Sequence, residues 1–291
     1  MRRIWFILTL ALTVSLIALA QQRTAPASSA TDPTARAQEV IKQARTAIWD
    51  ETKSRPLESL TINATSRTVQ GERQSTNEVT LDVLLPDKFL QTTSRNVGAA
   101  EFTSMIGING TQTWTDFRQP EFGGSPDGMA MRRGGNDGGA SREGQEIPSN
   151  ALPQVNHPEF ARLLLAWLLV TPATMPTEFT YVGEAKADGK TADVLDAKMS
   201  NGFATRLFIA QQTHQLLMLT YQMKMPKQEA QASVSEAEMR WVVSDYRNVN
   251  GINLPHRLTK SINGQAMGEV EIHKVKVNPS LKPSKFEKKG K

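Results

Sequence analysis

The residue types that most often perform chemistry in proteins occur in this sequence without the partners that such chemistry needs. The four histidines form no His-x-x-x-His or His-x-His pair, and there is no Gly-x-Ser-x-Gly elbow, phosphate-binding loop or dinucleotide fingerprint. Asp245 is the one acid inside a long apolar strand pattern, but Arg247 would share its face and pair with it. The stretch 134–139 has the composition of a calcium-binding repeat, yet it occurs once and such sites need repeated copies. We expect each histidine to be structural or at the surface: His157, His214, His256 and His273.

This pattern predicts a protein that is not an enzyme, with no catalytic residue, no metal and no cofactor. No activated nucleophile is visible in the sequence. A hydrolase whose groups come together from distant parts of the chain is the disfavoured alternative.

The apolar side chains indicate a different chemistry, the burial of hydrocarbon. The stretch 157–170 predicts a helix that is apolar nearly all round, and such a helix must be buried on most sides. Pro172 ends it, and only a concave sheet, or a sheet plus a second helix, could surround it. All of the 11 methionines except Met1 follow residue 20. Methionine adapts to irregular apolar partners, although ordinary core packing explains any single one. Together these features indicate a curved sheet with an apolar lumen that could bind an acyl chain.

The sheet itself is predicted from paired turn signals. Asn-Gly and Asp-Gly supply the positive φ angles of tight hairpins, and each such pair here separates stretches of strand pattern. We expect roughly ten strands in one meandering antiparallel sheet, preceded by a helix that Thr34 caps and that runs to about Ile48. In the strand 215–223, we expect Leu216 and Met218 to face one side and Leu217 and Leu219 the other. The turn pairs are Asn109-Gly110, Asp188-Gly189, Asn201-Gly202, Asn250-Gly251 and Asn263-Gly264.

The two ends of the chain predict export. Residues 1–20 have a basic start, an apolar run and a small-x-small site, which predicts a signal peptide cleaved before Gln21 rather than a membrane anchor. There is no cysteine, so N-acylation and thiol chemistry are excluded. The formal net charge of +5 includes a lysine-rich tail at 287–291, which we interpret as solvated rather than as a lipid contact. We predict a flexible linker at 21–34, one domain at 35–286 and a Gly-rich disordered insertion at 118–150.

The order of these elements resembles the periplasmic outer-membrane lipoprotein-sorting proteins, the LolA/LolB-like fold family. The resemblance covers about Ala35 to Phe286 apart from the Gly-rich insertion, and the order of the motifs carries it. In sequence order the matching motifs are Leu81–Phe89, Ile108–Trp114, Phe160–Val170, Asp245–Pro255, and Asn278-Pro279 with Phe286.

The resemblance implies an α+β fold with a single curved antiparallel sheet, an incomplete β-barrel wrapped over helices around an apolar cavity. It implies a periplasmic carrier for lipid or lipoprotein acyl chains, active in transport at the cell envelope and outer membrane. In the family's carrier an arginine that gates the cavity directly precedes the proline of the strand motif, whereas Leu85 occupies that position here. We therefore expect lipid binding without the standard gate.

We expect acyl chains to be the ligand, inner- or outer-membrane proteins to be candidate partners, and the protein to be a monomer that does not bind nucleic acid. The alternative is an envelope-state sensor that binds a membrane protein through a sheet edge or the Gly-rich insertion. The apolar helix would act as a lid. The candidate cavity residues are Leu81, Val83, Leu85, Trp114, Leu164, Trp167, Leu168, Met218 and Trp241.

Overall fold

The computed structural model describes residues 32–50, 55–70, 73–97, 100–118, 157–187, 189–199, 202–225 and 235–288. Its contacts divide the chain into Met1–Asp32 and Pro33–Lys291, and the second unit contains every helix and strand discussed below. The predicted signal peptide lies outside the described residues. So do the predicted linker up to residue 31 and the predicted insertion after Arg118.

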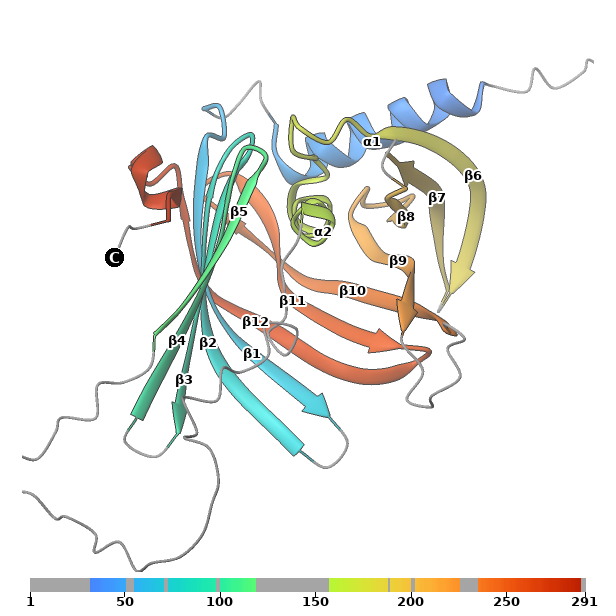
Figure 1. The fold of residues 1–291 in the computed structure, drawn as a ribbon. Helices are drawn as coiled ribbons and strands as arrows, with labels where there is room; N and C mark the ends of the chain where they lie inside the picture. Colours follow the sequence, from blue (N-terminus) through green and yellow to red (C-terminus); the bar gives the residue numbers. More distant parts are fainter. Residues whose placement is uncertain are drawn as a thin grey trace, which may run out of the picture. The chain divides into compact units, whose positions relative to one another are not determined.

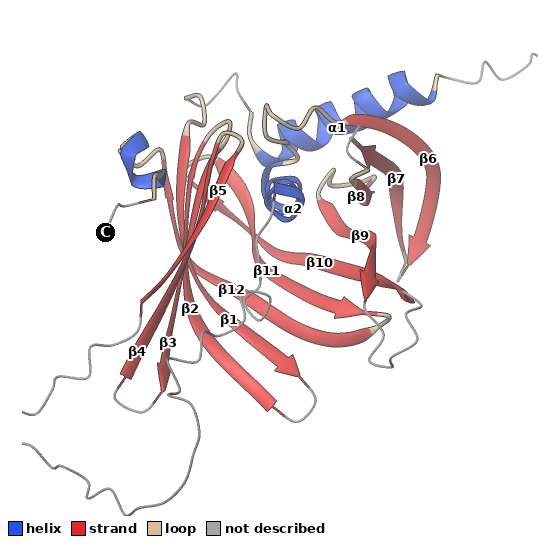
Figure 2. Ribbon diagram, in the orientation of Figure 1, coloured by secondary structure: helices blue, strands red, loops and turns tan. Residues whose placement is uncertain are grey.

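One antiparallel sheet of 12 strands forms the body of this unit (Figures 1 and 2). The first and last strands in sequence, β1 and β12, pair with each other at the middle of the sheet, while β5 and β6 are its two free edges. The sheet curves without closing, which confirms the predicted α+β fold with an incomplete β-barrel. The strands are β1 (Ser59–Gln70), β2 (Arg73–Leu84), β3 (Lys88–Val97), β4 (Ala100–Asn109), β5 (Gln112–Arg118), β6 (Glu178–Ala187), β7 (Lys190–Lys198), β8 (Ala204–Ala210), β9 (Leu216–Met225), β10 (Ser235–Val249), β11 (Ile252–Ile262) and β12 (Gln265–Val277).

The predicted turn pairs mark reversals of the chain. Asn250 and Gly251 have φ angles of 52° and 88° and form the two-residue loop between β10 and β11, because Val249 pairs with Ile252. Asn263 and Gly264, at 47° and 81°, join β11 to β12 in the same way. Positive φ at both central positions is the type I′ geometry that suits the twist of a hairpin. A glycine with positive φ also lies in the β4–β5, β6–β7 and β7–β8 connections: Gly110, Gly189 and Gly202.

The first helix, α1 (Pro33–Ile48), packs against β6 and β11. Its apolar face is buried as the 3.6-residue period predicts. The helix begins at Pro33, so Thr34 lies in its first turn and not at the predicted cap position. The buried residues of α1 are Ala37, Val40, Ile41, Ala44 and Ile48.

The second helix, α2 (His157–Leu168), lies on the concave side of the sheet, and α1 runs above it in the view of Figure 1. It contacts β9 and β11 of one half of the sheet, and its Phe160 packs on Phe89 of β3 in the other half. The helix ends at Leu168, and Leu169 directly after it has a φ of 53°, the left-handed conformation common just past a helix C-terminus. Arg45 of α1 donates a hydrogen bond of 2.9 Å from Nε to the Leu169 carbonyl, so the two helices are joined at this end.

A short 3₁₀ turn, η2 (Pro283–Phe286), packs against β3 and β4. Lys285 places its Nζ 2.6 Å from an oxygen of Asp82. The other oxygen of Asp82 accepts a hydrogen bond of 2.6 Å from Thr61. Asp82 and Thr61 alternate with the core residues Leu81 and Ile62, so η2 covers the convex face of this part of the sheet.

Candidate ligand-binding face of the half-barrel

The concave face of the sheet and α2 share one apolar core. Phe89 and Phe160 are both fully buried, and their ring centroids lie 4.8 Å apart at an interplanar angle of 38°. From Phe160 to Leu169, every apolar side chain of α2 is at most 9% exposed. A helix this short that is apolar nearly all round is not stable alone in water, so its position depends on the sheet that surrounds it.

Six of the nine predicted cavity residues lie together in this core, and Leu85 packs against it half-buried. Leu81 and Val83 come from β2, Trp241 comes from β10, and the other three come from α2. The indole nitrogen Nε1 of Trp167 is buried and has no hydrogen-bond partner. The six residues are Leu81, Val83, Leu164, Trp167, Leu168 and Trp241.

Trp114 lies on the opposite, convex face. It pairs with Gly107 across the β4–β5 ladder. Gly107 lies between Ile106 and Ile108, whose side chains point into the core, so Gly107 and Trp114 are on the other face. Its ring lies so close to Gly107 that a Cβ on that residue would be 2.1 Å from it. Its Nε1 donates a hydrogen bond of 2.7 Å to the carbonyl of Phe286 in η2. Trp114 therefore joins the C-terminal turn to the sheet and is not part of the candidate ligand-binding face.

Met218 also points to the convex face. In the β8–β9 pairing Phe208 lies opposite Met218 but Ile209 lies opposite Leu216, so Leu217 is an extra residue in β9. Such a bulge interrupts the alternation of a strand. Leu216 and Leu219 are both fully buried in the core as a result, whereas strict alternation would separate them.

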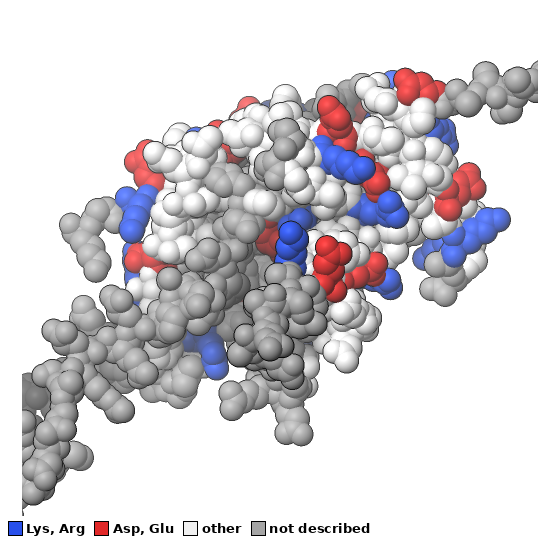
Figure 3. All heavy atoms as spheres, turned by 45° about the vertical axis from the view of Figure 1, so that its right-hand side comes forward, with Lys and Arg blue, Asp and Glu red and all other residues white. Residues whose placement is uncertain are grey.

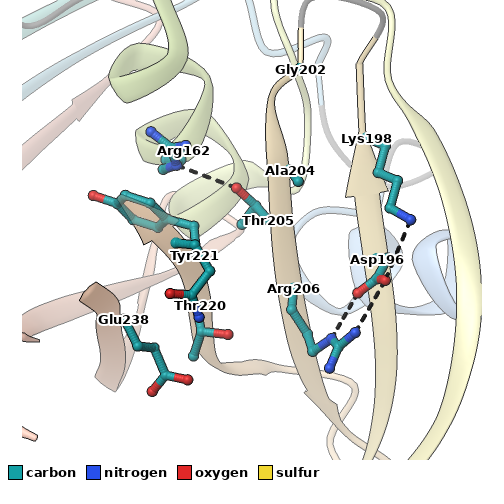
Figure 4. Close-up of a pocket in the computed structure, with 11 residues that line it drawn as sticks. Arg162, Asp196, Lys198, Gly202, Ala204, Thr205, Arg206, Thr220, Tyr221 and Glu238 are labelled. Carbon is teal, nitrogen blue, oxygen red and sulfur yellow. Dashed lines mark hydrogen bonds and ion pairs between the residues drawn. The ribbon is translucent and has the colours of Figure 1, made fainter. Parts of the chain in front are cut away.

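A polar cluster surrounds Arg162 at the first turns of α2 (Figure 4). The guanidinium carbon lies 3.6 Å from the centre of the Tyr221 ring and 4.7 Å from that of Phe203. Its Nε donates to Thr205 at 3.3 Å, and its Nη1 lies 3.3 Å from a carboxylate oxygen of Glu159. These contacts satisfy Arg162 by stacking and ion pairing.

The Tyr221 hydroxyl donates weakly to Glu159 at 3.4 Å. Burial, followed by the nearby Glu159 charge, raises the pKa of Tyr221. A hollow of about 410 Å³ lies beside this cluster and is lined by residues of α2 and of β7 to β10. The cluster offers a polar rim where α2 meets the sheet.

Lys260 of β11 is the most unusual ionisable group on the concave face. It pairs directly with Trp241 in the β10–β11 ladder, and its Nζ lies 4.1 Å from the centre of the Trp241 ring. Burial lowers the pKa of Lys260, and Glu159 partly opposes this effect. Among the described residues, no carboxylate lies within 4.0 Å of Lys260 Nζ.

Arg162 and Lys260 are not among the predicted cavity residues, although each leaves a signal in the sequence. Lys260 alternates in phase with the apolar Leu258 and Ile262, so a period of two places it on the inner face. Arg162 follows Glu159 by three residues in an otherwise apolar helix, which is the spacing of an ion pair.

Three of the other groups considered for chemistry, Asp245, His256 and His273, have ordinary structural partners. Asp245 and Arg247 pair as predicted, with Nη2 at 2.5 Å and Nε at 3.1 Å from the two carboxylate oxygens. The Arg247 hydrogen bond lowers the pKa of this exposed Asp245. The buried His256 ring bonds the Leu254 carbonyl at 3.0 Å, and His273 lies 2.6 Å from the hydroxyl of Thr65.

In the part of the chain that the structure describes, no group of three or more His, Cys, Asp or Glu side chains is arranged to bind a metal ion. Within the same ranges, no helix has both the length and the apolar character needed to cross a bilayer. The face seen in Figure 3 carries basic and acidic side chains intermixed. Arg206 of β8 and Asp196 of β7 form one such exposed pair, at 2.7 Å.

No protein-family model and no curated protein sequence matches the chain. Among solved structures, it is similar to a LolA superfamily protein from Nitrosomonas europaea, with a TM-score of 0.53 and 11% identity over 87% of this chain and 97% of the other. A DUF1329 family protein from Desulfovibrio piger gives a TM-score of 0.54 and 11% identity over 88% and 98%. At this identity the likeness shows the fold alone. The chain has the LolA-like fold, as the order of its motifs predicts.

Proposed function

We propose that this protein is a binding or carrier protein for the acyl chains of lipids or lipoproteins, and that it is not an enzyme. The observation that carries the proposal is the position of α2, an apolar helix enclosed on the concave side of an unclosed sheet. The LolA-like fold is compatible with it, because this fold leaves a concave apolar face under an unclosed sheet. An acyl chain would gain about 0.8 kcal/mol for each CH₂ group that it buries.

The ligand would occupy the space where α2 now packs. In this proposal α2 is a lid that fills the cavity of the empty protein and moves aside when an acyl chain enters. Its contacts with the sheet are mainly apolar, and an acyl chain can replace such non-directional contacts. The hydrogen bond from Arg45 to Leu169 would anchor the C-terminal end of the lid as its other end moves.

We further propose that the protein is exported, acts in the periplasm and works as a monomer. The basic and apolar pattern of residues 1–20 supports export. Transfer of acyl chains between membranes requires a carrier that shields hydrocarbon from water, and an enclosed apolar face would provide that shield.

A second candidate function is the envelope-state sensor. The sheet ends in two free edge strands, β5 and β6, and Val182 of β6 is 49% exposed. An unpaired edge can accept a strand from a partner protein. A membrane-protein partner bound there would leave the concave face without a ligand, so the two candidates differ in whether lipid is retained.

Mass spectrometry of the mature protein purified from the periplasm tests the proposal, under native conditions and after organic extraction. We expect about one acyl-containing ligand per chain. A Leu168→Glu variant should lose it, because Leu168, which is 5% exposed, is a proposed cavity residue and a carboxylate there would oppose contact with hydrocarbon. The matched control is Val242→Glu on the convex face, where Val242 is 39% exposed, and it should retain the ligand. Circular dichroism must show that both variants keep the sheet.

If the wild-type protein is empty and remains empty after incubation with membrane lipids, the carrier proposal is wrong and the sensor is favoured. If Leu168→Glu folds and still retains lipid, α2 is not a lid.

A further inference from the structure

Lys260 is a cation on the concave face whose close partner in the described structure is an aromatic ring. Its Nζ lies over Trp241 at 4.1 Å, and its exposure is intermediate. A cation–π contact compensates only part of the hydration that a buried amine loses. A second charge of opposite sign would compensate far more, because the attraction between charges grows as water is excluded.

Arg162 differs from Lys260 in the partners of its charged group. Its guanidinium already has Glu159 and the hydroxyl of Thr205 as partners, and it stacks on the rings of Tyr221 and Phe203. Lys260 has Glu159 only as a distant charge that raises its pKa, against the stronger effect of burial. Among the described residues on the concave side, Arg162 therefore has a carboxylate within ion-pair distance and Lys260 does not.

There is open space next to Lys260. A hollow of about 360 Å³ lies between the ends of the β1–β2 and β11–β12 hairpins, and Lys260, Thr68 and Ser75 contribute to its lining. Arg67 and Glu269 also line it, and these two side chains pair with each other at 3.8 Å. Gly268 pairs with Lys260 across the β11–β12 ladder and brings no side chain. Only glycine fits at that position, because a Cβ would lie 2.4 Å from the carbonyl oxygen of Arg67. A small polar group could thus sit beside the amine, with hydroxyl groups nearby to donate hydrogen bonds.

We propose that Lys260 binds the anionic head group, a carboxylate or phosphate, of an acyl-chain ligand whose hydrocarbon runs over Trp241 towards the position of α2. This inference rests on the proposed acyl-chain binding and adds to it the charge of the ligand. Glu159 belongs to α2, so it leaves Lys260 when the lid moves, and the head group of the ligand replaces it as the counter-charge. The protein would then select acids and anionic lipids over neutral lipids of the same chain length.

The test compares laurate with dodecanol, which share a 12-carbon chain and differ in charge, by displacement of a neutral fluorescent probe from the mature protein. We expect the wild-type protein to prefer laurate by about tenfold or more, the factor that about 1.4 kcal/mol provides. Lys260→Met should bind both compounds equally, with dodecanol affinity close to that of the wild type. The matched control is Lys274→Met, which removes an exposed lysine of β12 and should keep the preference.

The outcomes separate this inference from the proposed function. If both compounds bind the wild-type protein equally, or if Lys260→Met keeps the preference, the head-group assignment is wrong while acyl binding stands. If neither compound binds, acyl binding fails and the assignment fails with it. Inorganic phosphate should not displace laurate at equal concentration, and displacement would show a site for free anions rather than for a lipid head group. A thermal melt of Lys260→Met at or above that of the wild type confirms that the variant is folded.

Discussion

Replacing Leu165 with alanine would separate a lid from an ordinary core helix. Leu165 lies in α2, its side chain is fully buried, and it is outside the set of predicted cavity residues. The substitution should therefore weaken the packing of α2 against the sheet without removing a group proposed to contact the ligand. A Leu→Ala change at such a site costs about 2–5 kcal/mol.

The expected gain in ligand affinity follows from this cost. If the docked α2 must leave before an acyl chain enters, the apparent affinity is reduced by the small fraction of molecules in which it has left. Weakening the docked state by about 2 kcal/mol raises that fraction, and with it the apparent affinity, about 30-fold. The affinity stops rising once the open form predominates.

Titration with a fluorescent fatty acid, together with urea unfolding, measures both quantities. The control is Leu195→Ala in β7, which removes the same atoms from an equally buried position in the sheet. Both variants should lose a similar free energy of unfolding, but only Leu165→Ala should bind the fatty acid more tightly. Unchanged or weaker binding by a folded Leu165→Ala would refute the lid and leave α2 as part of the permanent core.

Three further predictions concern single contacts. Arg45→Met removes the hydrogen bond to Leu169 and should cost about 1 kcal/mol in urea unfolding without changing the rate of fatty-acid uptake in stopped-flow fluorescence, because the anchored end of α2 keeps this bond in the closed and the open form; a faster uptake would contradict the anchoring role. Trp114→Ala should cost about 2–4 kcal/mol in urea unfolding by releasing Phe286, with ligand affinity unchanged, and a loss of affinity would place Trp114 in the ligand site after all. Burial lowers the pKa of Lys260, so the charged amine destabilises the folded state. This destabilisation is full below the folded-state pKa and disappears above the unfolded-state value of about 10.4. Lys260→Met should raise the melting temperature most at low pH, and a gain that does not shrink as the pH rises towards that value would be inconsistent with a buried amine.

Local patterns account for much of the fold. The hairpins that turn at Asn250 and Asn263 have the dihedral angles that Asn-Gly favours, and these depend on the two turn residues alone. The buried face of α1 follows from a period of 3.6 residues, and the enclosure of α2 follows from its lack of a polar face. The pairing of β1 with β12, by contrast, joins residues 200 or more positions apart, and no local signal specifies it.

The candidate site was less predictable because strand alternation can be broken. The extra residue Leu217 reverses the order of faces along β9 and sends Met218 outward, and a bulge leaves little trace in one sequence. Trp114 ends a strand motif that resembles the LolA-like family, but the motif does not specify which face of the sheet the ring occupies, and η2 half-buries it on the convex face. Lys260 is not among the predicted cavity residues, and its partner Trp241 is identified only by the register of β10 and β11.

Photocrosslinking locates the ligand and tests acyl binding on the concave face most directly. The mature protein would be labelled with a 12-carbon fatty acid that carries a diazirine at the end of its chain, and the modified peptides would be mapped with and without excess laurate. We predict saturable labelling of peptides that contain Phe89, Leu164 or Trp241, which share the core beneath the concave face. Labelling of the convex row formed by Phe208, Met218 and Val242, or no labelling that laurate suppresses, would contradict the account.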